Sequence, residues 1–414
     1  MSKRRVVITG LGAITPVGGN MADSWQAVRE GVCGIGPITQ YDPAGQKVKL
    51  AAEVKSFVPE EHLSKQEARR MSRFIQFAVA AARETLADAA MQPGQFDPER
   101  CGVVVSSGIG GLGTIEAAHE RGAEHGWDRV SPFFIPTIIC NMAAGQIAID
   151  AGFQSMCTCP VTACAGGSNA VGDAFHYIRD GYADAMLCGG TESCITPLAI
   201  GGFTSMKALH QGEDPGRASI PFDAERSGFV MGEGAAILML EELEHAQKRG
   251  AKIYAEVVGY GATCDAYHMT APAPGGAGGA KAMELALKDG GIAPEAVDYI
   301  NAHGTSTSLN DSGETDAVKT VFGPHAYELM MSSTKSMTGH MLGAAGAVEA
   351  AFSALALRDG FVPATIHYQV KDEHCDLDVV PNEGRNVPIQ VAMSNSLGFG
   401  GHNASLVFQK WEGK

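Results

Sequence analysis

The chain has 414 residues, of which 45% are hydrophobic and 19% are charged, which is the composition of an ordinary globular protein with a large core. This length predicts about two to three domains. Acidic residues outnumber basic ones by 46 to 31, giving a net charge of −15, and no basic stripe is evident. These features argue against a nucleic-acid partner.

Ten cysteines are scattered along the chain without any C-x-x-C pair, a pattern that favours free thiols in a reducing compartment. Neither long uncharged run, 130–149 or 386–409, is continuously apolar enough to span a bilayer, and no signal peptide is evident at the start. We therefore expect a cytoplasmic protein that does not enter a membrane.

Strand-like apolar runs alternate with helical patterns along the chain. The segment Lys65–Met91 carries apolar residues at helical spacing and predicts one long helix. The alternation favours an α/β fold in which helices cover mainly buried sheets. Strands are expected at residues 6–9, 102–106, 185–188, 235–240, 253–258, 299–302, 391–394 and 404–408.

Three sequence features recur, in the same order, in the two parts of the chain. Residues 7–13 resemble 257–262, and a helix, a proline turn and a strand recur at 86–101 and 287–297. The pattern Ala-Val-x-x-Ala-Phe followed by Arg-Asp-Gly occurs at 170–181 and again at 347–360. Chance hardly supplies all three, so we predict two homologous α/β halves, 1–250 and 251–414, joined near the helical segment 241–250.

The sharpest chemical signal is the segment Val161–Ser168. We read it as a buried apolar strand running into small residues and then into a helix from about residue 165 to 179. Cys164 would then lie near a helix N-terminus, whose partial positive charge favours the nucleophilic thiolate. The preceding Cys157 and Cys159 are interpreted as alternate strand positions in a core rather than as a metal site.

Two histidines have matching settings in the second half. His303 follows the apolar strand at 299–302, and His340 follows a Ser/Thr-rich segment that begins at Ser332. Functional groups collect at the carboxyl ends of strands in α/β folds. Both histidines are therefore candidate site residues.

Four motifs together resemble the β-ketoacyl-[acyl-carrier-protein] synthases, most of all the elongating type II form of bacterial fatty acid synthesis. The resemblance covers essentially the whole chain. It implies a thiolase fold, that is, two βαβαβαββ halves in α-β-α-β-α layers, and a homodimer. It also implies substrates carried on the phosphopantetheine of acyl carrier protein, without a separate cofactor or metal. The motifs are Thr162-Ala163-Cys164, His303-Gly304-Thr305-Ser306-Thr307, Lys335-Ser336-Met337-Thr338-Gly339-His340 and Gly398-Phe399-Gly400-Gly401.

The resemblance also implies a role for each catalytic residue. Cys164 would accept the acyl chain, while His303 and His340 would stabilise the enolate formed when malonyl carrier protein loses CO2. The backbone amides of Cys164 and Phe399 would form an oxyanion hole. Lys335 and Glu314 would supply a supporting ion pair or hydrogen-bond network.

Further positions match the family's binding surfaces. Ile109 occupies the position that tunes chain length, and Phe399 would be the gate between acyl pocket and malonyl site. Ile109 lies within the pattern Gly108-x-Gly110-x-x-Gly113. That pattern only imitates a dinucleotide-binding motif, because no suitable acidic residue follows it. The other expected positions are Phe134, Ile135 and Phe203 in the acyl pocket, Thr270, Thr305 and Thr307 along the phosphopantetheine, and Lys65, Arg69, Arg70 and Lys207 at the carrier-protein docking surface.

The chain also departs from the family pattern. His402 replaces the usual Thr after the glycine motif, Leu397 replaces a Phe, and the segment before Cys164 lacks the common Gly-Pro start.

Three alternative functions stay open at this point. A thiolase would need a second catalytic Cys near the C-terminus, a discrete polyketide-type ketosynthase shares the motifs, and a non-catalytic chain-length partner would lack the nucleophile. Neither the preferred acyl length nor the pathway follows from the sequence.

Overall fold

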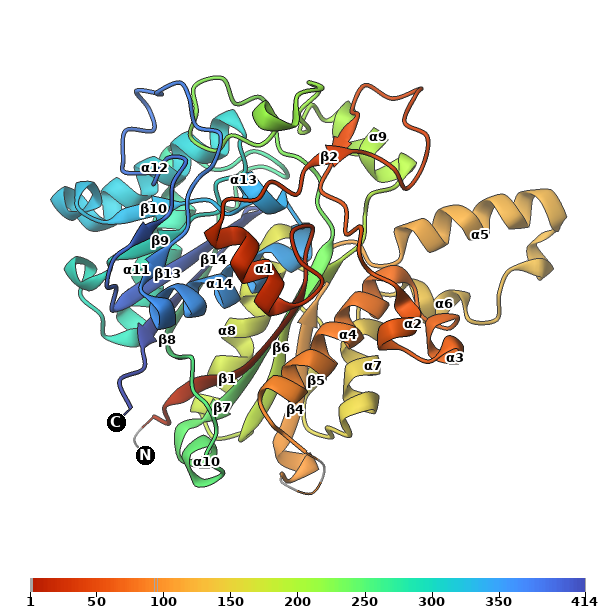
Figure 1. Cartoon of the computed structure of the whole chain (residues 1–414), viewed down its shortest axis with the longest axis horizontal. Coiled ribbons are helices and arrows are strands. Elements are labelled where there is room, and N and C mark those ends of the chain that lie inside the picture. Colours follow the sequence, from red (N-terminus) through yellow and green to blue (C-terminus); the bar gives the residue numbers. More distant parts are fainter. Residues whose placement is uncertain (1–2, 93, 95, 414) are drawn as a thin grey trace.

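The computed structural model describes residues 3–92, 94 and 96–413 and contains a ten-stranded mixed sheet (Figure 1). Its strand order is β10-β9-β13-β14-β8-β1-β7-β6-β4-β5. The strands are β1 (Val6–Ile14), β4 (Cys101–Ser106), β5 (Cys157–Thr158), β6 (Ala185–Glu192), β7 (Gly234–Glu242), β8 (Ala255–Cys264), β9 (Tyr299–Asn301), β10 (Met330–Ser332), β13 (Val391–Gly398) and β14 (His402–Lys410). Two small sheets pair β2 (Gly36–Pro37) with β3 (Leu50–Ala51) and β11 (Phe361–Val362) with β12 (Arg385–Asn386).

The strand order confirms the internal repeat, because equivalent strands of the two halves occupy equivalent positions on either side of the central pair. Strands β1 and β8 pair antiparallel, with Val6 opposite Val257. Outward from them, β7, β6, β4 and β5 on one side correspond to β14, β13, β9 and β10 on the other. Helix α10 (Leu243–Lys248) connects the two halves. The division of the chain between residues 250 and 251 stays a prediction.

Helices lie on both faces of each half-sheet, in the five layers expected from the resemblance. Alternate residues of β4 show this: Val104 packs into the core around α8 (Gly166–Arg179) and α14 (Ala345–Asp359), whereas Val103 and Val105 pack toward the opposite face. Figure 1 shows α8 and α14 at the centre, between the strands of the two halves. The outer layers are α4 (Arg73–Asp88) with α7 (Met142–Ala151) on one half and α11 (Ala277–Gly290) with α12 (Ser308–Phe322) on the other.

The Gly-x-Gly pair in each copy of the repeat has a packing cause. A Cβ on Gly12 of β1 would lie 2.2 Å from the carbonyl oxygen of Ala81 on α4, and a Cβ on Gly261 of β8 would lie 2.1 Å from that of Ala282 on α11. Both outer helices therefore press their backbones onto the central strands, which only glycine allows.

The ends of the central helices also correspond. Positive φ occurs at Ala163, before α8, and at Leu342, before α14. When Ala163 is aligned with Leu342, the Arg-Asp-Gly segments at the ends of the two helices are aligned as well. The two Ala-Val-x-x-Ala-Phe patterns are then offset by two residues. That part of the predicted repeat therefore does not pair structurally equivalent residues.

Two local predictions are wrong. The expected helix Lys65–Met91 is broken into α3 (Lys65–Ala68) and α4, because Ser64 and Glu67 form a capping box on α3 and the chain restarts a helix after Ser72. The strand before Cys164 is not a buried one: β5 is a two-residue exposed strand at the sheet edge, and Cys159 is only half-buried.

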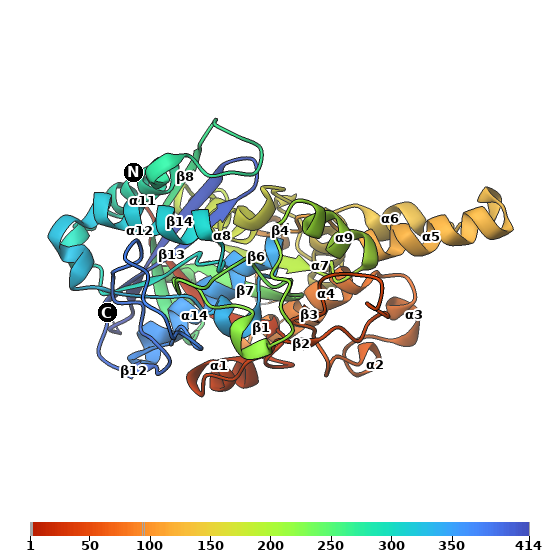
Figure 2. The same ribbon diagram turned by 90° about the horizontal axis from the view of Figure 1, so that it is seen from above.

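Six further α-helices complete the described part of the chain, and one of them, α13 (Lys335–Thr338), is fully buried. Helix α5 projects from the body and is followed by α6, as Figure 2 shows. Within the described part of the chain, no helix is long and apolar enough to cross a membrane. These helices are α1 (Met21–Arg29), α2 (Pro59–His62), α5 (Leu112–His125), α6 (Phe134–Ile138), α9 (Pro197–Ser205) and α13 (Lys335–Thr338).

Candidate active site

Cys164 lies in the short 3-10 turn that leads into α8. Its side chain is 8% exposed, and the preceding Ala163 has φ +49°, an unusual value for a residue with a Cβ. The turn is sharp because the chain leaves an edge strand and enters the central helix within a few residues. This placement at the N-terminus of α8 is the one predicted from the sequence.

The expected thiolate is not favoured in the resting structure. Burial raises the pKa of the Cys164 thiol to about 12, while Lys335 and the backbone amide of Phe399 act in the opposite direction without outweighing it. The free-energy cost of desolvating a charged sulfur is thus larger than the stabilisation that nearby positive charge provides. The Cys164 thiol is therefore protonated at rest.

This burial predicts a pH dependence. Alkylation of Cys164 by iodoacetamide should accelerate about tenfold per pH unit from about pH 7 to 9.5 without reaching a plateau, because the thiolate is the reacting form and its fraction grows up to the pKa. The rate is read by mass spectrometry of the Cys164 peptide, with the exposed Cys157 peptide of the same sample as an internal comparison. A plateau below about pH 8 would contradict the dominance of burial.

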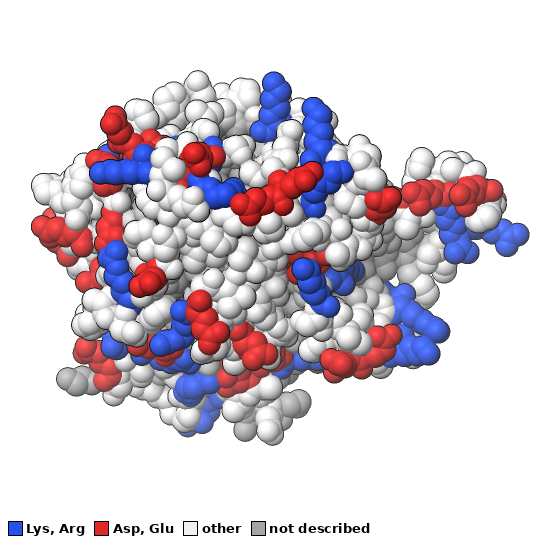
Figure 3. Space-filling model, turned by 45° about the horizontal axis from the view of Figure 1, so that its top comes forward, with Lys and Arg blue, Asp and Glu red and all other residues white. Residues whose placement is uncertain are grey.

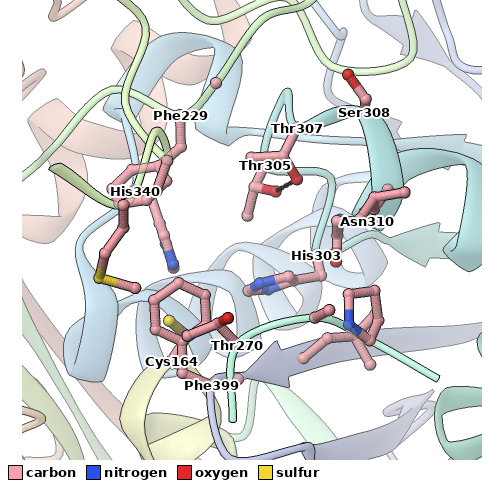
Figure 4. Close-up of a pocket in the computed structure, with 18 of the residues that line it drawn as sticks. Cys164, Phe229, Thr270, His303, Thr305, Thr307, Ser308, Asn310, His340 and Phe399 are labelled. Atoms are coloured by element: carbon pink, nitrogen blue, oxygen red, sulfur yellow. Dashed lines mark hydrogen bonds between the residues drawn. The ribbon is translucent and has the colours of Figure 1, made fainter. Parts of the chain in front are cut away.

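The two predicted histidines converge on the same space as Cys164. His303 follows β9 and His340 precedes α14, and their ring centroids lie 5.2 Å apart at 87°. Backbone bonds fix His340, whose amide donates to the carbonyl oxygen of Val230 at 2.7 Å. Figure 4 shows the side chains of Cys164, His303 and His340 directed into one pocket.

Both imidazoles are held neutral. Burial lowers the pKa of His303 and of His340 well below the ordinary value, and the nearby charge of Lys335 lowers both further. A neutral imidazole keeps one N–H group that can donate to an oxygen. The Nδ1 atom of each ring has no hydrogen-bond partner among the described residues. The pair can therefore offer donors to an oxygen bound between them.

Two arrangements were expected for Lys335 and Glu314, an ion pair or a hydrogen-bond network, and the structure contradicts the ion pair. Lys335 is 1% exposed and its ammonium group forms an ion pair with Glu349 on α14. Burial raises the pKa of the Glu349 carboxyl to about 7 against the opposing effect of Lys335. Glu349 was not predicted from the sequence, although one signal was present: it is the single charged residue in the otherwise small and apolar segment 345–357.

Glu314 instead supports the backbone of the histidine loop. Its carboxylate accepts from the amides of His303 and Gly304, each at 2.8 Å, and from the side-chain amide of Asn395 at 3.3 Å. Burial raises the pKa of Glu314 to about 7, opposed by those two backbone amides. Glu314 thus belongs to the hydrogen-bond network, as expected, but acts on His303 rather than on Lys335.

The pocket in front of Cys164 has a volume of about 350 Å³ and joins residues from both halves of the chain. Thr305 and Thr307 lie on one wall with their hydroxyl oxygens 3.0 Å apart, and Thr270 lines the same pocket. Lys207 also lines it and is exposed. Lys207, Thr270 and the neighbouring pair Thr305 and Thr307 lie at least 35 positions apart in the sequence, yet the fold assembles them around one pocket.

The hairpin between β13 and β14 places Phe399 beside Cys164. A Cβ on Gly398 would lie 3.1 Å from the backbone nitrogen of Cys164, so only glycine permits this approach. The backbone amide of Phe399 is near enough to the Cys164 sulfur to lower the pKa of the thiol. The ring of Phe399 lies 6.2 Å from that of Phe203, another predicted residue that lines the pocket. The oxyanion hole expected at the amides of Cys164 and Phe399 stays a prediction.

Other predicted residues do not reach this pocket within one chain. Ile109 packs against the apolar cluster that contains Cys164 but does not line the open pocket. Ile135, on α6, is 58% exposed, and Phe134 lines a separate hollow together with Arg69. Lys65, Arg69 and Arg70 are exposed at α3 and the turn after it, and the Arg70 guanidinium lies 5.2 Å from the ring centroid of Phe133.

The unusual His402 lies at the base of the same hairpin. It is half-buried, pairs with Cys264 across β8 and β14, and does not line the pocket. A Cβ on Gly400 would lie 3.0 Å from two atoms of its ring. The imidazole therefore packs against the turn that carries Phe399.

Comparison with known proteins agrees with this geometry. The model of the β-ketoacyl synthase N-terminal domain matches residues 3–246, and that of the C-terminal domain matches residues 254–369. The chain is 52% identical over 413 residues to the 3-oxoacyl-[acyl-carrier-protein] synthase 2 of Synechocystis, covering 100% of this chain and 99% of that protein. It is 53% identical over 409 residues to the protein of the same name from Staphylococcus aureus, with 99% of each covered.

The fold has close counterparts among solved structures. One is a type II polyketide ketosynthase in complex with its acyl carrier protein, with a TM-score of 0.92, 36% identity, and 99% of this chain and 100% of that chain covered. Because two family models together span most of the sequence and curated relatives match its full length at more than half identity, the chain belongs to the β-ketoacyl synthase family.

Proposed function

We propose that the protein elongates fatty acids by decarboxylative Claisen condensation of malonyl-[acyl-carrier-protein] with an acyl chain bound to Cys164. The observation that carries this proposal is the convergence of one buried thiol and two neutral imidazoles in a single pocket. The higher identity to the 3-oxoacyl-[acyl-carrier-protein] synthases 2 than to the polyketide ketosynthase favours elongation over polyketide synthesis.

The first half-reaction transfers the acyl group. The Cys164 sulfur attacks the thioester carbonyl of the acyl carrier protein, and the phosphopantetheine sulfur leaves as a thiol after taking up the proton lost by Cys164. The negative charge that develops on the carbonyl oxygen is met by the amides of Cys164 and Phe399. Because the Cys164 thiol is protonated at rest, it loses its proton as its sulfur attacks the thioester carbonyl.

The second half-reaction makes the carbon–carbon bond. Loss of CO2 from the malonyl group leaves an enolate, whose oxygen receives hydrogen bonds from His303 and His340. The enolate carbon then attacks the acyl thioester, the C–S bond to Cys164 breaks, and a β-ketoacyl product two carbons longer stays on the carrier protein. The Lys335–Glu349 pair keeps a positive charge near the imidazoles and so helps to hold them neutral.

The test is an elongation assay with purified protein, malonyl carrier protein and a ladder of acyl carrier proteins, with products identified by mass. Products two carbons longer support the proposal. Acylation of the protein without elongation would favour a polyketide-type or specialised role instead. Absence of any acylation would favour the non-catalytic partner.

We propose that Ile109 limits the length of the acyl chain, because it packs beside the apolar cluster around Cys164. Ile109→Phe should shorten the longest primer that is accepted, since overpacking of an apolar site costs about 1–3 kcal/mol. The product ladder of the elongation assay measures this. An unchanged ladder for a variant that folds and is acylated by short primers would contradict the pocket role.

Carrier-protein docking is proposed for Lys65, Arg69, Arg70 and Lys207. All four are exposed, and Lys207 lies at the rim of the catalytic pocket, where the phosphopantetheine would enter past Thr270, Thr305 and Thr307. On the face drawn in Figure 3, basic side chains form separate groups among acidic ones. Local basic groups of this kind attract an acidic carrier despite the negative net charge of the chain.

Lys207→Glu is expected to raise the KM for acyl carrier protein about tenfold at low salt and to change kcat little, because a rim charge acts mainly on encounter. The measurement is initial rate against carrier-protein concentration at about 50 and 300 mM salt. Lys288→Glu, on α11 and outside the catalytic pocket, is the matched charge reversal. Equal KM values for the two variants would contradict docking at Lys207.

A homodimer in the cytoplasm is proposed as the working form. The exposed edge strand β5 and exposed apolar side chains, among them Ile149 at 74% and Val161 at 54%, offer a surface for a second copy. Analytical ultracentrifugation tests the dimer. All ten cysteines are free thiols, which supports a reducing compartment.

A further inference from the structure

Glu192 is a buried carboxylate beside the nucleophile that the proposed chemistry does not use. It ends β6 and is 0% exposed. Burial raises its pKa, and the hydrogen bonds from backbone amides oppose that effect. The donors that it accepts from are all neutral: the Ser107 hydroxyl at 3.1 Å, the amides of Gly108, Ile109 and Gly343 at 2.8, 3.3 and 3.1 Å, and the Cys194 thiol at 3.4 Å.

These donors come from both halves of the molecule. Ser107, Gly108 and Ile109 form the loop after β4, whereas Gly343 lies between His340 and α14. A Cβ on Gly108 would lie 2.8 Å from the Glu192 Oε2 atom, and one on Gly343 would lie 3.0 Å from it. The two backbones therefore close directly onto the carboxylate, which joins them where the halves meet.

The loop that Glu192 links to Gly343 is the one that carries Ile109. Its other end is also held, because the amide of Gly110 donates to the Ser107 hydroxyl at 3.1 Å and the amide of Gly111 donates to the carbonyl oxygen of Ile138 at 3.0 Å. The Ile109 side chain packs against the apolar cluster that includes Cys164 and Leu342. An acyl chain that extends past Ile109 must therefore move a loop tied to Glu192.

We propose that Glu192 is a positioning residue that holds the Ile109 loop closed against the His340–Gly343 segment and thereby sets how readily long acyl chains are accepted. The inference rests on the proposed elongation function. The contact to the Ile109 amide, at 3.3 Å, is the longest of the three backbone bonds and is the one that yields first when the loop moves. Long primers carry the cost of that movement, and short primers do not.

The test is Glu192→Gln in the full-length protein. The amide keeps the volume of the side chain but replaces one accepting oxygen with a donor that faces other donors. Weakening of these bonds should raise the ratio of kcat/KM for long primers over short primers about three- to tenfold. Primers of increasing length are compared, with Cys164 acylation followed by mass for each.

Glu53→Gln is the matched control. Glu53 is 1% exposed and also anchors a loop, accepting from the amides of Thr39 and Gln40 at 2.8 and 3.0 Å, yet it does not line the catalytic pocket. This variant should lower stability without changing the primer-length ratio. Ser107→Ala removes the hydroxyl that donates to Glu192 and accepts from the Gly110 amide, while the three backbone bonds to Glu192 remain. It should shift the ratio in the same direction as Glu192→Gln but by less.

The outcomes separate the inference from the function beneath it. A wild-type protein that is never acylated would overturn the elongation function. If the wild type elongates, a Glu192→Gln variant with an unchanged ratio of kcat/KM for long over short primers would overturn the positioning role. An equal fall in kcat/KM for all primers leaves that ratio unchanged and would overturn it too. Should Glu192→Gln fail to fold, an unchanged ratio in Ser107→Ala would overturn it as well.

Discussion

Cys164→Ala is expected to abolish elongation, with product formation falling at least about 10⁴-fold. Cys164 supplies the one thiol among the residues that line the pocket beside both imidazoles, and in the proposed reaction no acyl-enzyme can form without it. The elongation assay measures the loss, and intact-protein mass measures the missing acyl adduct.

The control for this variant is Cys188→Ala, which removes the same sulfur from a fully buried position in β6 outside the pocket. It should lose stability through the small cavity but keep its acylation and elongation. Both variants are first checked for folding by thermal unfolding. Elongation retained by a folded Cys164→Ala protein would refute the nucleophile assignment.

His303→Ala and His340→Ala are expected to separate the two half-reactions. Acyl transfer to Cys164 should persist, while CO2 release from malonyl carrier protein should fall about 10²- to 10³-fold in each variant, the usual cost of removing one oxyanion donor. Acyl-enzyme is measured by mass and CO2 by release from labelled malonyl carrier protein. His367→Ala is the control, because its Nδ1 also has no partner among the described residues and burial lowers its pKa, yet it lies outside the pocket.

The same histidines predict how decarboxylation responds to pH. Since both pKa values lie well below the ordinary value of 6.5, both rings stay neutral as pH falls from 8 to 6.5 and continue to donate. Protonation of the imidazoles should therefore take no part in any pH dependence of CO2 release by the preformed acyl-enzyme over that range, whereas Glu314 and Glu349, whose pKa values are raised to about 7, change their charge within it. A loss of CO2 release near pH 7 that persists in Glu314→Gln and Glu349→Gln and disappears in the histidine variants would contradict the neutral state.

The three candidate catalytic residues, Cys164, His303 and His340, could be found in the sequence because each follows a strand end or precedes a helix in a run of small and hydroxyl-bearing residues. Local composition reports such turns directly, since glycine, serine and threonine are needed where the backbone approaches a substrate. The repeat was visible for a similar reason: the Gly-x-Gly pairs mark the places where α4 and α11 press onto β1 and β8. Both signals are local.

The partner of Lys335 is a different kind of feature. Glu349 lies inside α14, and only the packing of that helix against α13 turns an isolated acidic residue into the ion-pair partner of a buried lysine. The family resemblance suggested Glu314, whose carboxylate instead accepts from the backbone amides of the His303 loop. Pairing of buried charges depends on relative helix positions, which no local pattern records.

The two-fold repeat and most strands follow from the sequence alone, which also singles out Cys164, His303 and His340, because periodicity and turn composition are properties of short segments. The protonation state and the partners of those three side chains depend instead on how the fold packs. Burial holds Cys164 as a thiol and the imidazoles neutral, and the meeting of the two halves gathers the Ile109 loop and the His340 segment onto Glu192. Desolvation and long-range contacts arise only when distant segments pack together, so they follow from the fold.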